Sequence, residues 1–104
     1  MIKASEAKQN SLKLDEENKN NSYYYNEVLS EEIYKASEAG RYEYLLATPI
    51  PALKKDSSLR TTEDGFVVLE QIKRWLQFDG YKVSNFCGNL KISWESAPNQ
   101  QSNG

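Results

Sequence analysis

The apolar positions of this chain recur with helical spacing in a first stretch that begins near residue 23. They follow one another at steps of three and four, which places them on one face of a helix: Tyr25, Val28, Leu29, Ile33 and Ala36. Gly40 comes shortly after the last of them. Glycine readily takes the left-handed backbone conformation that ends a helix. The pattern therefore predicts a helix over residues 23–39.

A second stretch repeats this arrangement further along the chain. Its apolar residues are again three and four positions apart: Val68, Leu69, Ile72, Trp75 and Leu76. Gly80 follows them as Gly40 follows the first series. Upstream, Thr61 or Thr62 can cap a helix, and acidic residues come next, where the helix dipole favours negative charge. We therefore expect this helix to begin near Thr62 and to end before Gly80.

Three shorter runs alternate between two sets of side chains, as strands do. The first, RYEYLLA over residues 41–47, ends at two nearby prolines. The other two, residues 81–86 and 90–94, flank the short segment CGN and predict a β-hairpin. The alternation assigns Tyr81 and Val83 to the buried side of the sheet, together with Leu90, Ile92 and Trp94 of the partner strand, and Phe86 is a further candidate for that side.

The remaining segments lack a strong apolar pattern. Residues 1–21 are rich in Lys, Glu, Asn and Ser, and predict a polar arm or a short, weakly docked helix that ends in the Asn and Ser cluster at 18–22. Residues 50–62 contain proline, serine and charged side chains, and predict an exposed connection with a turn near Leu53. The tail 96–104 is expected to be disordered.

The order helix, helix, strand, helix, strand, strand predicts an α+β fold. Residues 22–95 form a single domain in this interpretation, with a three-stranded sheet covered on one face by two helices. The strand, helix and strand of residues 42–86 favour a parallel crossover, and the final strand is antiparallel through the hairpin. Three strands leave an open edge and an uncovered face, which is a reason to expect a partner.

The composition of the chain argues against several classes of function. The chain has 104 residues, 13 Lys and Arg against 15 Asp and Glu, a net charge of −2 and no histidine. This balance argues against nucleic-acid binding by bulk charge. One cysteine, Cys87, can form neither an intramolecular disulfide nor a zinc site without further ligands. No apolar run is long enough to predict a membrane helix, so we expect synthesis in a cytoplasm.

Candidate chemistry is sparse, and we predict that the protein is not an enzyme. Cys87 in the CGN turn is interpreted as a small turn side chain rather than a nucleophile, because no activating partner is evident. Five carboxylates fit a solvated helix surface or a first helical turn better than a metal site: Asp15, Glu16, Glu17, Glu63 and Asp64. Because the glycines are far apart, no phosphate-binding loop is indicated. We expect no catalytic residues, cofactor or metal.

Aromatic residues indicate an interaction surface instead. Tyr23, Tyr24 and Tyr25 are consecutive, and neighbouring side chains on a helix point about 100° apart, so at most two of them can enter the core. A core of this size has little room for every other large aromatic side chain as well. Tyrosine offers a large, rigid contact area with a polar tip, which suits interfaces. The candidate interface residues are Tyr23, Tyr24, Tyr25, Tyr42, Tyr44 and Trp94.

Four segments carry a resemblance to small proteins of tailed bacteriophages. They are SEAK at 5–8, IYKASEAGRYEY at 33–44, LQFDGYKV at 76–83 and LKISWE at 90–95. Proteins that share this pattern, in which a helix ends in Gly-Tyr-x-Val and an Ile-x-Trp strand closes the chain, are assigned to the virion or have unknown roles.

The resemblance implies a non-enzymatic structural protein of a tailed-phage particle. It would be made in the host cytoplasm and located in the virion, and would contact itself and larger virion proteins. The alternative is an accessory protein that inhibits a host defence protein, or that sequesters a small nucleotide between aromatic and arginine side chains. Both hypotheses remain open on the sequence. A small-molecule ligand is the less expected partner, and neither nucleic acid nor a membrane is expected.

Overall fold

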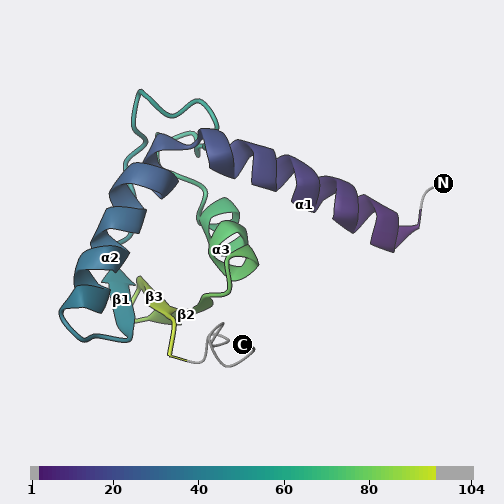
Figure 1. The fold of residues 1–104 in the computed structure, drawn as a ribbon. Coiled ribbons are helices and arrows are strands. Elements are labelled where there is room, and N and C mark those ends of the chain that lie inside the picture. The colour runs from purple at the N-terminus through teal and green to yellow at the C-terminus, as the bar shows by residue number, and fades with distance from the viewer. Residues whose placement is uncertain (1–2, 96–104) are drawn as a thin grey trace.

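The computed structural model describes residues 3–95 and has an α+β fold (Figure 1). The tail 96–104, for which disorder was predicted, lies outside the described residues. A π-helical segment, η1, leads directly into the second helix. In chain order the elements are α1 (Ala4–Asn21), η1 (Tyr24–Leu29), α2 (Ser30–Glu38), β1 (Glu43–Leu46), α3 (Leu69–Phe78), β2 (Lys82–Phe86) and β3 (Asn89–Ser93).

The sheet has the strand order β1-β3-β2, and both pairings are antiparallel. Strands β1 and β2 therefore run in the same direction, as the predicted crossover requires. They are not neighbours, however, because β3 lies between them. The hairpin partner thus occupies the centre of the sheet, where both of its edges are hydrogen-bonded. The two helices that follow α1 in the chain cover one face of this sheet.

The core lies between this covered face and the helices. Leu90 and Ile92 of the central strand are fully buried, and so are Ile72, Trp75 and Leu76 of α3. The predicted helix faces are confirmed, because every apolar residue of the first series is buried or half-buried. Each large buried side chain removes apolar surface from water, which contributes about 1.5–3 kcal/mol.

Both predicted helix ends are confirmed at their glycines. Gly40 has φ +85°, and its N–H donates to the carbonyl of Ser37, while the N–H of Arg41 donates to the carbonyl of Ala36. These two bonds form a Schellman motif, which satisfies carbonyls that the helix itself leaves free. The same pair of bonds closes α3 at Gly80, which has φ +97°.

The predicted start of the third helix is wrong. Helix α3 begins at Leu69, and no side chain caps it. Thr62 instead forms a turn, in which its carbonyl accepts from the N–H of Gly65 and its hydroxyl oxygen accepts from the N–H of Phe66. Isolated β-bridges join Thr61 to Val67 and Pro51 to Phe66. These tertiary pairings hold residues 61–67 in a non-helical conformation despite the local capping pattern.

The connection between β1 and α3 is also not the exposed loop that was predicted. It contributes Ile50 and Leu59 to the core, although the turn expected near Leu53 is present, since the N–H of Asp56 donates to the carbonyl of Leu53. Buried Gln71 of α3 fixes this segment, because its Nε2 donates to the carbonyl of Ser58 at 2.9 Å and its Oε1 accepts from a neighbouring backbone N–H at 2.8 Å. Hydrogen bonds of this kind pair the backbone N–H and C=O groups of the segment, so that an irregular segment can be buried.

The hairpin turns at Cys87 and Gly88, which both have positive φ, as a two-residue type I′ turn requires. Its register pairs Val83 with Ile92 on the covered face. Phe86 is three residues beyond Val83 and therefore points to the opposite face, where it is 52% exposed. The assignment of Phe86 to the buried side is wrong for this reason.

Helix α1 is longer than the short helix that was predicted, and only Ser22 interrupts the helical backbone before η1. Its C-terminal half packs on α3, where Asp15 is buried and pairs with Arg74 at 3.1 Å. Its N-terminal half is exposed and projects away from the rest of the fold (Figure 1). None of the helices described here is long and apolar enough to cross a membrane.

Candidate protein-interaction surfaces

The tyrosine triplet divides between core and surface. Tyr24 and Tyr25 are each only 7% exposed, whereas Tyr23 is 39% exposed. The expectation that at most two of the three enter the core is met. Tyr23 remains available at the surface, where the ammonium of Lys55 lies 5.0 Å from the centre of its ring. In this chain, Tyr24 and Tyr25 are core residues and offer little accessible contact area.

A buried carboxylate explains why the triplet is held in this orientation. Asp56 reaches the beginning of the helix from the connection, and its Oδ1 accepts from the N–H of Tyr23 at 2.7 Å. Its Oδ2 accepts from the N–H of Tyr24 and from the hydroxyl of Ser22. The carboxylate thus satisfies backbone donors that a helix start leaves free, and its charge suits the positive end of the helix dipole. No local pattern signals this cap, because Asp56 lies more than 30 residues away in the sequence.

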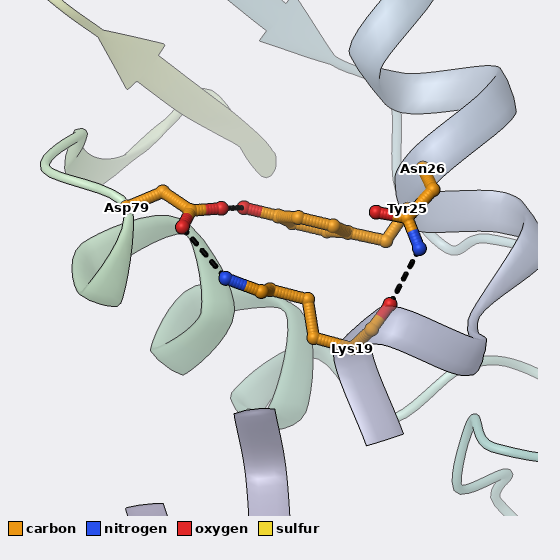
Figure 2. A network of polar contacts seen from close by, with 4 residues as sticks. All are labelled: Lys19, Tyr25, Asn26 and Asp79. Carbon is orange, nitrogen blue, oxygen red and sulfur yellow. Dashed lines mark hydrogen bonds and ion pairs between the residues drawn. The ribbon is translucent and has the colours of Figure 1, made fainter. Parts of the chain in front are cut away.

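A polar network joins Tyr25 to the ends of two other helices (Figure 2). The Tyr25 hydroxyl donates to Oδ2 of Asp79 at 2.5 Å, and the Lys19 ammonium donates to Oδ1 of the same carboxylate at 2.7 Å. The side-chain amide of Asn26 donates to the Lys19 carbonyl at 2.6 Å. Asp79 follows the last residue of α3, where the helix dipole disfavours a negative charge, and Lys19 offsets that cost. The network therefore fixes α1 against η1 and α3.

Burial also governs the protonation of the core tyrosines. Desolvation raises the pKa of Tyr25 well above its usual range, and the hydrogen bond to Asp79 and the charge of that carboxylate raise it further. Burial raises the pKa of Tyr24 to about 12, with smaller contributions from Tyr44 and Glu32. Both phenols are thus held in the neutral form. Their chemistry is that of structural hydrogen-bond donors rather than of reactive phenolates.

Tyr42 and Trp94 lie together at one corner of the sheet. The N–H of Trp94 donates to the carbonyl of Tyr42 at 3.0 Å, although the side chains differ in exposure. Tyr42 is 62% exposed, whereas Trp94 is half-buried and meets Tyr81 edge to face at 6.2 Å. A shallow depression of about 460 Å³ surrounds this corner. Its lining consists of Gly40, Arg41, Tyr42, Glu43, Leu45 and Glu95.

Tyr44 lies on the covered face of the sheet, whereas the depression includes Leu45 on the uncovered face. It pairs with Ile92 in the register of the sheet and packs partly buried against the core. Burial raises its pKa, and the charge of Glu32 adds to the effect. The structure therefore brings Tyr42 and Trp94 together, and places Tyr44 on the covered face with the core tyrosines.

The uncovered face of the sheet carries two large apolar side chains that the sequence analysis did not select. Leu45 on β1 is 43% exposed, and Phe86 on β2 is 52% exposed. Lys91 of the central strand lies between the two edges, 3.5 Å from a carboxylate oxygen of Glu43 and 5.9 Å from the centre of the Phe86 ring. The alternation of β1 and β2 contains this signal, because Leu45 and Phe86 are out of phase with the buried positions. We call Leu45, Phe86 and Lys91 the open-face patch.

A second shallow depression, also of about 460 Å³, lies where the connection meets the start of α3, and its lining includes Thr62, Asp64, Phe66, Val67, Leu69 and Glu70. A hollow of about 60 Å³ beside the polar network is lined by Tyr25, Leu29, Ser30, Ile33, Asp79 and Tyr81. Cys87 is exposed at the hairpin turn. Within residues 3–95, no group of three or more His, Cys, Asp or Glu side chains is arranged to hold a metal ion.

Comparison with known proteins adds no relative. No protein-family model, no curated protein and no solved structure matches this chain.

Proposed function

We propose that this protein is a non-enzymatic structural component of a tailed-phage particle, and that it acts through protein–protein contacts at the open-face patch. The observation that carries the proposal is the exposure of Leu45 and Phe86 on the uncovered face of the sheet. On the covered face, by contrast, Leu46, Leu90 and Ile92 are buried. Side chains of this size on a sheet left open on one side favour a partner.

The composition of the patch resembles that of transient interfaces. Its apolar side chains flank a charged pair, in which Lys91 of the central strand lies 3.5 Å from Glu43 of β1. Transient interfaces mix apolar and charged side chains, and aromatic residues contribute much of their contact energy. The assignment to a phage particle comes from the four segments that resemble small tailed-phage proteins.

The location is tested by quantitative mass spectrometry of purified particles from a phage that encodes this chain. The proposal expects the chain at a fixed ratio to the major capsid protein in every preparation. Absence from particles, combined with abundance in infected cells, would contradict it. That result would favour the alternative of an accessory protein that acts on a host protein.

The surface is tested by a paired substitution. Leu45→Ser combined with Phe86→Ser removes the apolar side chains while leaving the fully buried core untouched. We expect particles to lose this chain, while its melting temperature in isolation changes little. The matched control is Tyr34→Ser, because Tyr34 is similarly exposed but lies on α2, away from the sheet. Equal incorporation of the paired variant and the control would contradict a role for the patch.

A further inference from the structure

Helix α1 is docked on the rest of the fold through a narrow stripe of mostly polar side chains. Its residues are exposed except for four that recur at helical spacing on one face: Leu12, Asp15, Asn18 and Lys19. Only the leucine among them is apolar, and only the aspartate is fully buried. The elements that follow bury five residues that belong to the core: Tyr24, Tyr25, Leu29, Ile33 and Ala36. Burial of apolar surface, which stabilises most packed helices, therefore contributes little to the docking of α1.

The contacts across this stripe join charged groups of α1 and α3. Oδ2 of Asp15 lies 3.1 Å from Nε of Arg74, and among residues 3–95 neither atom makes a hydrogen bond of good geometry. The Lys19 ammonium lies 2.7 Å from Oδ1 of Asp79 (Figure 2). It also lies 4.7 Å from the centre of the Phe78 ring. Partly exposed ion pairs contribute little net stability, and a buried pair gains little beyond the cost of removing its charges from water. The docked position of α1 thus depends on electrostatic contacts that salt screens.

The helix also lacks strong stabilisation of its own. No side chain caps its N-terminus. Residues 4–11 are exposed throughout and project from the fold (Figure 1). Polar helices of this length are marginal in water, because most helical stability in proteins comes from packing. When α1 leaves α3, it therefore loses much of its helical structure.

The helical segment that follows α1 is anchored independently of it. Ser22 separates the two with an extended backbone conformation, φ −85° and ψ 117°, and is itself buried. Asp56 accepts hydrogen bonds from the Ser22 hydroxyl and from the N–H groups of Tyr23 and Tyr24. In a continuous helix these two N–H groups would donate to carbonyls of α1. Because the Asp56 carboxylate replaces those carbonyls, the start of η1 stays ordered without α1.

We propose that α1 is a strap with a docked and a released state, and that it pivots at Ser22. On release, residues 4–21 leave α3 as one unit while residues 22–95 stay folded. In the docked state the strap covers the outer face of α3 around Arg74 and Phe78. Release frees the Arg74 guanidinium, exposes more of the Phe78 ring and leaves the Asp79 carboxylate with the Tyr25 hydroxyl alone. The strap thus controls access to this face of α3, and ionic strength sets the balance between the two states.

The first experiment is hydrogen exchange of the full chain, followed by NMR at about 0.01 M and about 1 M NaCl, between which the screening length falls from about 30 Å to about 3 Å. We expect the amides of residues 15–21 to exchange at a common opening rate that is at least about tenfold faster at high salt. The amide of Tyr24, just beyond the pivot, and that of Trp75 in α3 should keep their protection. The contrast between Asn21 and Tyr24 locates the pivot.

Two variants each remove one docking contact, and each has a matched control on α1. Lys19→Gln is compared with Lys13→Gln, because Lys13 is exposed and carries the same charge. Asp15→Asn is compared with Glu16→Gln, which neutralises the neighbouring exposed carboxylate. At low salt we expect Lys19→Gln and Asp15→Asn to raise the population of the released state about tenfold. The two controls should leave it unchanged.

Limited digestion with trypsin measures the same opening by a second route. The Lys19 side chain is 13% exposed in the docked state, so cleavage after it requires release. We expect a fragment that begins at Asn20 to accumulate and to resist further cleavage. Its rate of formation should follow the released population, and should therefore be about tenfold higher for Asp15→Asn than for Glu16→Gln.

Four outcomes would overturn the proposal. Amides of residues 15–21 that exchange as slowly as that of Trp75 would show that α1 opens only with the whole fold. Exchange that does not respond to salt would show that electrostatic contacts do not hold the strap. Loss of protection at Tyr24 together with α1 would remove the pivot, and an α1 without protection at low salt would remove the docked state.

Discussion

Removal of the Asp56 carboxylate is expected to be among the most destabilising single changes in this protein. Asp56→Ala deletes a buried group that accepts hydrogen bonds from the N–H groups of Tyr23 and Tyr24 and from the Ser22 hydroxyl. Loss of a helix N-cap costs about 0.5–2 kcal/mol, and a buried donor left without an acceptor costs about 1–3 kcal/mol. Because these two contributions overlap, we expect a loss of about 2–4 kcal/mol.

That loss is large compared with the stability of about 5–15 kcal/mol that is usual for a domain. The assay is equilibrium unfolding in urea, followed by tryptophan fluorescence, since Trp75 is fully buried beneath the capped helix. Asp56→Asn keeps one acceptor oxygen and is expected to lose only part of the stability. Asp64→Ala removes an exposed carboxylate from the same connection and should change the free energy of unfolding by less than about 0.5 kcal/mol.

An unfolding free energy for Asp56→Ala within about 0.5 kcal/mol of the parent would refute the reasoning. It would mean that water or a rearranged backbone satisfies the donors of the helix start at no cost. A loss as large for Asp64→Ala as for Asp56→Ala would refute it as well, because the effect would then come from net charge and not from the cap.

Three further expectations concern the other contacts described above. Unfolding free energy should fall as pH rises above 10, by up to about 1.4 kcal/mol per unit for each buried tyrosine, because Tyr24 and Tyr25 have a raised pKa in the folded state and ionise first in the unfolded chain. Asp79→Ala should destabilise the fold by about 1–3 kcal/mol, since the Tyr25 hydroxyl and the Lys19 ammonium both lose their acceptor. Cys87→Asn should stabilise the hairpin by about 0.5 kcal/mol, because asparagine tolerates positive φ in a type I′ turn.

Each of these has a direct check by urea unfolding. Tyr25→Phe should reduce the alkaline slope, and a stability that stays constant from pH 9 to pH 11 would contradict the sign derived from the two pKa shifts. Glu95→Ala, which removes an exposed carboxylate elsewhere, is the control for Asp79→Ala, and equal losses would contradict the network. For the turn, a Cys87→Asn variant less stable than Cys87→Ala would contradict the conformational argument.

Structural features that depend on patterns within a few residues could be predicted from the sequence. The spacing of Tyr25, Leu29 and Ile33 predicts a buried helix face because the helical period is a property of the local backbone. Gly40 and Gly80 predict helix ends for the same reason, and the short CGN segment predicts the hairpin. From these elements the α+β class follows, and so does the exposure of at least one tyrosine of the triplet.

Reasoning from local sequence patterns identified only part of the candidate interaction surface. Tyr42 was selected and is exposed, whereas Tyr24 and Tyr25 were selected and are buried. Leu45 was missed because the analysis did not decide which side of β1 faces the core, and Phe86 was missed because it was grouped with Val83 although it is out of phase with that residue. A shift of one residue in register moves every side chain of a strand to the other face.

Only the tertiary structure decided the contacts between distant segments. Asp56 caps a helix from more than 30 residues away, and Ile50 and Leu59 enter the core from a segment with the composition of an exposed loop. Thr62 has the sequence of a helix cap but forms a turn, because the bridges that join Thr61 to Val67 and Pro51 to Phe66 hold its segment in a non-helical conformation. Local propensities amount to tenths of a kcal/mol per residue, and a buried hydrogen bond or apolar side chain exceeds them. The sequence by itself thus determined the elements and their apolar faces, while long-range packing determined where each element begins and which side chains remain at the surface.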